Sequence, residues 1–311
     1  MLARVAESLY WMGRYVERSE HCSRFLNVQY FSTLEAPMLH SKDFTLRSIL
    51  FMFSAEVDND SEVEAQEVWQ KVIFDFANPN SLIQLAYKAR ENARSIKNTI
   101  STELWEAINK WYLYNKSIDR IQFSSADVFD YTSENIKLLA LIKSSAETTL
   151  LHNDVWRFFY LGVGLERALQ VLRITQSKIS DSTILSDNGT NIPLQQYQYS
   201  ILLRSLECFD IYNSYYRGAI ITRKSIYDLI LNNKLFHRSV ISTADKIQKQ
   251  IERISVRPDN YGGMVEGFNR KKEECFQFAD LNDEEKVLDD IQNCNKCFGD
   301  LHKQIEQIYF Q

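Results

Sequence analysis

Proline, glycine and cysteine are scarce in this chain of 311 residues. It has only 4 prolines and 9 glycines, and because these residues mark tight turns, the many short strands of an all-β protein are disfavoured. The five cysteines are an odd number in a long chain, which favours reduced thiols over a disulfide framework. Long helices suit this composition, and we predict an all-α fold.

The sequence also lacks an excess of positive charge and a long apolar segment. Its formal net charge is -5, whereas nucleic-acid-binding domains usually carry a basic face. Charged residues interrupt every apolar run near the N-terminus, so the sequence predicts neither a secretory signal nor a membrane span. We therefore expect a cytoplasmic protein that binds neither nucleic acid nor a membrane.

Signatures of common enzymes and cofactor sites are missing as well. There is no Walker loop, no nucleophile elbow and no His-Glu-x-x-His. Gly162-Val163-Gly164 opens like a dinucleotide fingerprint, but Arg167 stands where the third glycine is needed. Cys294-x-x-Cys297 has the spacing of zinc ligands, yet it lies in a charged helical segment rather than in knuckle loops. We expect no cofactor and no metal.

One pattern of aromatic, glycine, Glu-Arg and arginine occurs twice in the chain. Tyr10-x-x-Gly13-x-x-x-Glu17-Arg18-x5-Arg24 is matched, 149 residues later, by Phe159-x-x-Gly162-x-x-x-Glu166-Arg167-x5-Arg173. Shorter matches follow at offsets of 157 and 158: Leu46-Arg47-Ser48 with Leu203-Arg204-Ser205, and Ser81-Leu82 with Ser239-Val240. We predict an internal duplication, with quasi-equivalent helical repeats over 1–150 and 151–311 packed across a pseudo-twofold axis as one compact unit.

Apolar spacing and turn residues place the expected helices and loops. Loops are predicted at 32–42 and, where polar turn residues are densest, at 180–193. A helix start is predicted at 58–62. The predicted helices include 4–29, 44–54, 81–100, 195–216, 222–232 and 238–255.

The glycines of the repeated pattern predict a close helix crossing. A glycine inside a helix costs roughly 1 kcal/mol relative to alanine, so Gly13 and Gly162 need a reason, and the close approach of another backbone supplies one. Adjacent helical residues point about 100° apart. Arg18 and Arg167 are therefore expected to point away from the glutamates that precede them.

The charges of the two patterns allow two interpretations. In the first, Glu17 and Glu166 meet Arg173 and Arg24 across the crossing and form a buried, structural network, because buried charges are usually paired. In the second, a polar cavity between the repeats holds a carboxylate or phosphate, with Glu17 or Glu166 as catalytic acid or base. The candidate anion-binding arginines are Arg18, Arg24, Arg167, Arg173, Arg47, Arg90, Arg94 and Arg204.

The motifs resemble those of a known bacterial family. The opening segment from Arg4 to Arg18, the Ala89-Arg90-Glu91-Asn92-Ala93-Arg94 segment and the second Glu-Arg doublet closely resemble the alpha-E family, a helical domain named for its Glu-Arg motif. The resemblance extends from the first residues to at least Ser239.

What this resemblance implies is a role beside other proteins. Alpha-E proteins accompany circularly permuted ATP-grasp proteins and transglutaminase-like peptidases, in a suspected pathway that makes or modifies a peptide. An accessory or interaction module that works with an ATP-grasp ligase is the first expectation. An enzyme, or enzyme subunit, that takes an anionic small molecule or peptide at the repeat junction is the alternative. The resemblance attaches no reaction to the domain, so both stay open.

Overall fold

Thirteen α-helices form the fold in the computed structural model, which describes residues 2–39, 42–55, 63–186, 192–278 and 280–311. The first six are α1 (Ala3–Leu39), α2 (Lys42–Met52), α3 (Ala65–Trp69), α4 (Leu82–Ser95), α5 (Thr102–Ser117) and α6 (Val128–Thr149). The others are α7 (Asp154–Ser186), α8 (Ile192–Ser205), α9 (Phe209–Tyr215), α10 (Arg223–Tyr227), α11 (Val240–Arg253), α12 (Tyr261–Cys275) and α13 (Glu284–Tyr309). These ranges contain no strand, and the all-α prediction is confirmed.

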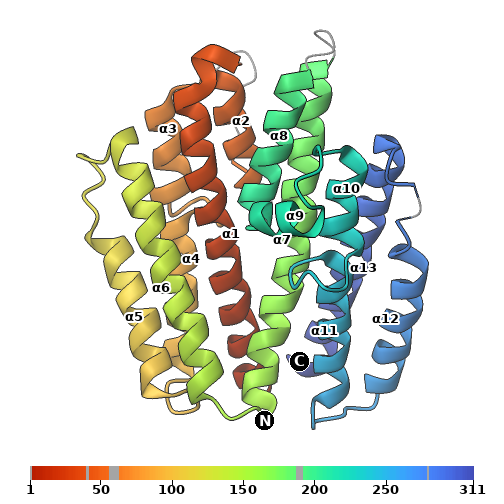
Figure 1. The fold of residues 1–311 in the computed structure, drawn as a ribbon. Coiled ribbons are helices and arrows are strands. Elements are labelled where there is room, and N and C mark those ends of the chain that lie inside the picture. The colour runs from red at the N-terminus through yellow and green to blue at the C-terminus, as the bar shows by residue number, and fades with distance from the viewer. Residues whose placement is uncertain (1, 40–41, 56–62, 187–191, 279) are drawn as a thin grey trace.

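Two long helices, α1 and α7, run side by side through the middle of the molecule (Figure 1). Helices α2 to α6 lie on the α1 side, where α4 and α6 pack directly on α1. Helices α8 to α13 lie on the α7 side, where α11, α8 and α13 pack on α7. The central pair therefore joins two groups of helices.

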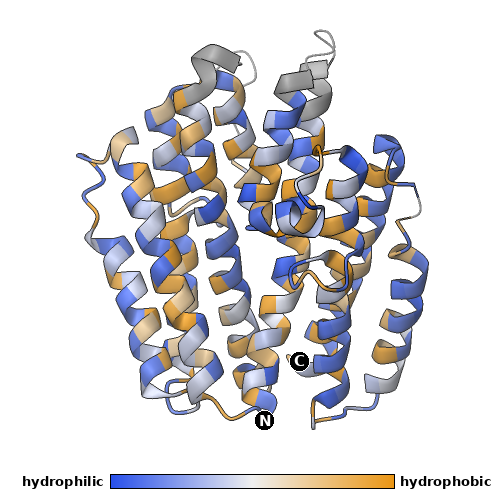
Figure 2. Cartoon of the chain, viewed as in Figure 1, coloured by the Kyte–Doolittle hydropathy of each residue, from blue (hydrophilic) through white to orange (hydrophobic). Residues whose placement is uncertain are grey.

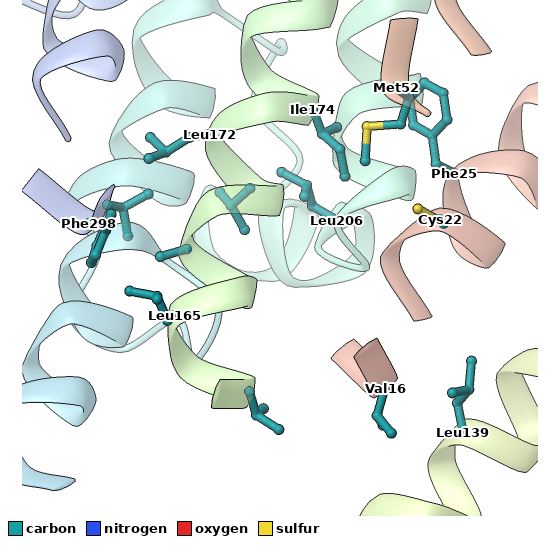
Figure 3. Packing of buried hydrophobic residues seen from close by; sticks show 14 of the residues in the cluster. Val16, Cys22, Phe25, Met52, Leu139, Leu165, Leu172, Ile174, Leu206 and Phe298 are labelled. Carbon is teal, nitrogen blue, oxygen red and sulfur yellow. The ribbon is translucent and has the colours of Figure 1, made fainter. Parts of the chain in front are cut away.

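The core continues from one group into the other. Figure 3 shows α7 directing Leu165 and Leu172 toward the side of Phe298, and Ile174 toward the side of α1 and α2. These side chains are almost completely buried, whereas α11 and α12 at the edge are largely hydrophilic in Figure 2. None of the helices described is both long and apolar enough to span a bilayer.

The backbones of α1 and α7 touch where the two glycines lie. A Cβ atom on Gly13 would lie 2.1 Å from the carbonyl oxygen of Phe159, and one on Gly162 would lie 2.0 Å from that of Tyr10. Real Cβ atoms do not approach other atoms so closely, so only glycine fits at either position. The predicted close crossing at Gly13 and Gly162 is confirmed.

In both groups the same local structure precedes a helix that packs against the central pair. A π-helical turn, Gln70–Phe74 in one group and Asp228–Asn232 in the other, precedes α4 and α11 respectively. Ser81 caps α4 by accepting from the amide of residue 84, and Ser239 caps α11 by accepting from the amide of residue 242. Each serine also donates to a carbonyl six residues earlier, at 2.6 Å and 2.5 Å. The sequence match at these serines therefore marks a matching loop-to-helix transition.

Several predicted boundaries are wrong. Helix α7 continues to Ser186 through the first half of the loop predicted at 180–193, because Asp181 is buried and bound to Lys178 and Ser48. Tertiary packing overrides the local turn signal there. Helix α1 likewise runs to Leu39, into the loop predicted at 32–42. The helix start predicted at 58–62 lies outside the described residues.

Candidate functional site

Glu166 on α7 is surrounded by polar groups from both central helices. Its Oε2 lies 2.8 Å from Arg14 Nε and 3.0 Å from Arg18 Nη2, and its Oε1 lies 2.6 Å from Arg18 Nε. Gln170, one turn along α7, donates to Oε1 at 2.7 Å. Since the side chain of Glu166 is only 1% exposed, these bonds replace its hydration.

Glu17 on α1 has an equivalent arrangement with different partners. Arg167 Nε lies 2.6 Å from its Oε1, and Lys143 from α6 lies 3.1 Å from its Oε2. His21, one turn along α1, places Nε2 3.4 Å from Oε1. The carboxylate is fully buried, so each central helix carries a buried glutamate that is bound by an arginine of the other.

The expected pairing of these glutamates is wrong in its partners. Glu17 and Glu166 bind the arginine that follows the other glutamate, not Arg24 and Arg173. Residues that contact each other rise in number together along α1 and α7, so the two helices run parallel. The two Glu-Arg doublets therefore lie side by side just past the crossing. A long arginine side chain then reaches across from its own face, whereas Arg24 and Arg173 lie two turns further along.

The positive neighbours fix the ionisation of the two buried glutamates. Burial opposes ionisation of Glu166, but Arg18 and Arg14 outweigh it and hold its pKa far below the usual range. For Glu17, Arg167 and Lys143 likewise overcome burial and lower the pKa well below the ordinary value. Both side chains are therefore carboxylates at neutral pH.

Glu20 is a third buried glutamate whose pKa is lowered in the folded protein. Burial and the nearby Glu17 oppose its ionisation, yet Lys143 and Arg238 lower its pKa to about 2. A carboxyl whose pKa is lowered by folding contributes stability above its unfolded pKa, and that stability is lost as the pH falls through the folded value. Acid should therefore weaken the central helix pair.

We expect the melting temperature to be nearly constant from pH 7 to 5 and to fall steeply between pH 4.5 and 2. Each unit of lowered pKa contributes about 1.4 kcal/mol, so Glu17, Glu20 and Glu166 together are worth several kcal/mol. Calorimetry across this range measures the effect, and Glu20→Gln should flatten the curve. A stability that stays level down to pH 2.5 would contradict the role given to these carboxylates.

A second ion cluster lies beyond Glu17, around Arg24. Arg24 binds Glu20 at 3.1 Å and also pairs with Glu207, which begins the loop after α8. Arg238, the residue before the α11 cap, contacts the same two acids, Glu20 at 3.3 Å and Glu207 more closely. Arg24, an expected anion holder, is thus neutralised by the chain itself.

A cavity of about 570 Å³ opens beside Glu166 at the junction of the two groups. Its lining combines three arginines, one carboxylate, several amides and a few apolar side chains: Arg14, Arg18, Phe51, Ser54, Pro79, Asn80, Glu166, Leu169, Gln170, Arg173, Gln176 and Asn295. Three of the predicted site residues, Arg18, Glu166 and Arg173, are brought together here.

Arg173 is the least neutralised of these cavity arginines. Its Nη1 donates to the carbonyl oxygen of Met52 at 3.3 Å, and among the described residues no carboxylate lies within ion-pair distance of its guanidinium. Arg18 binds both Glu166 and, at 2.8 Å, the amide oxygen of Asn80. Among the described residues, the donors of Arg173 are therefore the least engaged of those that line the cavity.

The remaining predicted arginines lie away from this cavity. Arg47 pairs with Asp43 at 2.7 Å, and the guanidinium of Arg204 lies 4.3 Å from the ring centre of Phe209. Arg90 stacks on Tyr112 and bonds Asn109, and Arg94 pairs with Glu91 at the surface. The repeat of Leu-Arg-Ser and the Arg90 to Arg94 segment thus contribute to local packing and surface ion pairs.

The cysteine spacing does not correspond to a metal centre. Cys294 is buried and its Sγ contacts the carbonyl oxygen of Cys275, while His302 Nδ1 lies 2.9 Å from the hydroxyl of Tyr10. Across the described part of the chain, no group of three or more potential ligands could hold a metal ion.

Sequence reasoning missed several residues of the two ion networks, among them Arg14, Glu20, Lys143, Glu207, His237 and Arg238. Arg14 lies one turn before Arg18, and this spacing could have indicated a shared face. Arg167 Nη1 lies 2.7 Å from His237 Nε2, and Lys246 Nζ lies 2.6 Å from Nδ1 of the same ring. Burial, with Arg167 and Lys246 nearby, lowers the pKa of His237 to about 4. No sequence signal places Lys143 or Arg238 near α1.

Comparison with known proteins gives one match. The model of the Alpha-E family, described as "a predicted alpha-helical domain with a conserved ER motif", matches residues 1–310. No curated protein and no solved structure matches the chain. The doublets Glu17-Arg18 and Glu166-Arg167 are Glu-Arg pairs of this sequence that join α1 to α7.

Proposed function

Because the chain belongs to the Alpha-E family, we propose that its Glu-Arg pairs are a fixed scaffold and that the cavity beside them binds an anionic ligand. The carrying observation is Arg173, whose guanidinium lines the cavity without a carboxylate partner among the described residues. The protein is then an anion-binding accessory module, and acid or base catalysis by Glu17 or Glu166 is not part of its function.

We further propose that the scaffold arose by duplication, with repeats over 1–150 and 151–311 related by a pseudo-twofold axis. Four kinds of matched feature support this: the crossing glycines, the reciprocal Glu-Arg pairs, the π-helical turns and the serine caps. The connection between α6 and α7, residues 150–153, contains the proposed boundary. Packing of both groups on the central pair supports one compact unit rather than two separate domains.

The charge balance of the cavity supports anion binding. Among the described lining residues, the guanidiniums of Arg14, Arg18 and Arg173 face the carboxylate of Glu166, and because Arg14 and Arg18 both bind it, Arg173 carries the positive charge that has no acidic partner there. Arginine presents its donors in a planar fork that matches a carboxylate or phosphate. A cavity of about 570 Å³ lies within the usual size range of small-molecule sites.

Arg173→Gln should weaken binding of anions by about 10–100-fold, because a hydrogen bond to a charged group contributes about 1.5–3 kcal/mol. Isothermal titration calorimetry with a panel of carboxylates and phosphates measures the affinity. The melting temperature without ligand should change little, since Arg173 is only partly buried and forms one long hydrogen bond.

Arg94→Gln is the matched control for this experiment. Arg94 is 64% exposed, lies outside the cavity and pairs with Glu91 at the surface, so its loss should leave anion binding intact. If Arg173→Gln and Arg94→Gln lost binding equally, the anions would be attracted by positive charge on the surface in general and not by the cavity. An intact chain that binds no member of the panel would reject the proposed function.

The family resemblance supports a partnership with an ATP-grasp protein, in a pathway that makes or modifies a peptide. We propose that the ligand of the cavity is a component of that pathway and that the protein works in the cytoplasm. The five free cysteines fit a reducing compartment. Mixing the purified chain with a circularly permuted ATP-grasp protein from the same organism, followed by size-exclusion chromatography, should give a joint peak, and separate elution at micromolar concentration would reject the partnership.

A further inference from the structure

The second group of helices contains a counterpart of the surroundings of Arg173 that is occupied by one of the chain's own carboxylates. Helix α2 is followed by Ser54 at φ 51°, and α8 is followed by Glu207 at φ 56°, so the two residues share an unusual left-handed conformation. In each case the next amide bonds a carbonyl five residues earlier, from Ala55 to Leu50 at 3.0 Å and from Cys208 at 2.9 Å. Ser54 and Glu207 therefore occupy matching positions, at an offset of 153 that pairs Leu203 with Leu50. The Leu-Arg-Ser match predicted at offset 157, which pairs Leu203 with Leu46, is out of register with this arrangement.

The arginines around these two positions also match. Arg24 and Arg173 are the last arginines of the repeated pattern, and Asn80 and Arg238 both precede the serine that caps the next helix. On the Glu207 side, its two carboxylate oxygens bind Arg24 and Arg238. The chain thus supplies its own anion to one of two matching sites.

On the Ser54 side the described residues place no corresponding anion. Ser54 has no carboxylate, and Leu169 stands where Glu20 stands on the other side, four residues before the arginine. Both Ser54 and Leu169 line the cavity together with Arg173. Glu207 itself borders open cavities of about 420 and 860 Å³, so what corresponds between the two halves is the place of its carboxylate between two arginines.

We propose that this cavity binds the carboxylate of a ligand at Arg173, in the place that Glu207 occupies in the matching site. The inference rests on the proposed function and names its ligand class. The carboxylate of Glu207 shows the expected geometry. One of its oxygens binds Arg24 on the long helix α1, and the other binds Arg238, the residue before the capping serine. In the cavity those groups are Arg173 and Asn80.

The charges favour a carboxylate over a phosphate. Asn80 takes the place of Arg238, so the cavity offers one cation fewer at this point than its occupied counterpart. Arg14 and Arg18 are already bound to Glu166. A phosphate dianion would bring a second negative charge close to that buried carboxylate, whereas a single carboxylate is balanced by Arg173.

The rest of the lining fits a ligand with amide groups and a short apolar part. Gln170, Gln176 and Asn295 offer both donors and acceptors, and Phe51 and Leu169 provide apolar surface. We infer an N-acylated amino acid or a short peptide that presents its free carboxylate to Arg173.

Installing the missing carboxylate tests the inference. Ser54→Glu should place a carboxylate on Arg173, raise the melting temperature by about 2 °C and reduce the affinity for N-acetylglutamate at least tenfold. Ser54→Gln, of the same size but neutral, should change neither the stability nor the electrostatics in this way. Ser54 is exposed and Glu207 already tolerates the same backbone conformation, so both variants should fold.

Probe chemistry tests the same point in the unmodified chain. N-acetylglutamate and a free-carboxylate dipeptide should bind more tightly than their amides and than inorganic phosphate or phosphoserine. Tighter phosphate binding, or unchanged carboxylate binding in Ser54→Glu, would overturn the inference but leave an anion-binding module. If the unmodified chain binds none of these anions, the proposed function fails and the inference fails with it.

Discussion

Gly13→Ala and Gly162→Ala should each destabilise the protein by at least about 3 kcal/mol, at the upper end of the cost of overpacking a core. The added methyl group would lie 2.1 Å or 2.0 Å from a backbone carbonyl oxygen of the other central helix. Backbone cannot move aside as a flexible side chain can. The helices must separate, and the reciprocal Glu-Arg pairs just past the crossing would lengthen with them.

Chemical denaturation measures this loss, and two other helical glycines provide the control. A Cβ atom on Gly267 in α12 or Gly299 in α13 would meet nothing within 4 Å. Alanine at those positions should stabilise the protein, by up to about 1 kcal/mol each, through its higher helix propensity. If Gly13→Ala were as harmless as Gly299→Ala, the close crossing of α1 and α7 would be refuted.

Glu166→Gln should cost about 3–5 kcal/mol, the usual penalty for removing one partner of a buried ion pair. The glutamine keeps the shape of the side chain but leaves Arg14, which is 5% exposed, and Arg18 without their carboxylate. Unlike the glycine variants, it adds no atoms to the crossing. The loss therefore isolates the electrostatic part of the scaffold.

Glu134→Gln is the matched control for this charge. Glu134 is 40% exposed and pairs with Lys137 on the surface of α6, and exposed pairs of this kind contribute about 0–1 kcal/mol. The stability of Glu166→Gln should also fall less steeply between pH 4.5 and 2 than that of the unmodified chain. A Glu166→Gln variant as stable as Glu134→Gln would show that the Glu-Arg motif is not a structural requirement of this fold.

The close crossing followed from the sequence because a glycine inside a helix has a local cost that only a tertiary contact offsets. Gly13 and Gly162 could therefore be assigned to a backbone contact before their neighbours were known. The partners of Glu17 and Glu166 could not be assigned in this way. Helix geometry gives the direction in which a side chain leaves its own helix, but an arginine is long enough to cross to the neighbouring one.

For the cavity, too, the sequence predicted some features and not others. Arg18, Glu166 and Arg173 were candidates from their place in the repeated pattern, and they line one cavity. Arg204, from the Leu-Arg-Ser match, and Arg90, from the Ala89 to Arg94 segment, were candidates as well, yet they stack on aromatic rings elsewhere. Some arginines contact an acid or an aromatic ring in the folded protein and others do not. Their positions in the sequence do not distinguish the two kinds.

The sequence by itself determined the helical class, the family and the two points at which the long helices meet, because composition, motif and glycine placement are local properties of the chain. Only the tertiary structure decided which charges are neutralised. Glu207 and Arg24 are 183 residues apart in the chain, and their pairing depends on how α8 packs beside α1. The same packing leaves Arg173 facing an open cavity, since Ser54 brings no carboxylate to meet it.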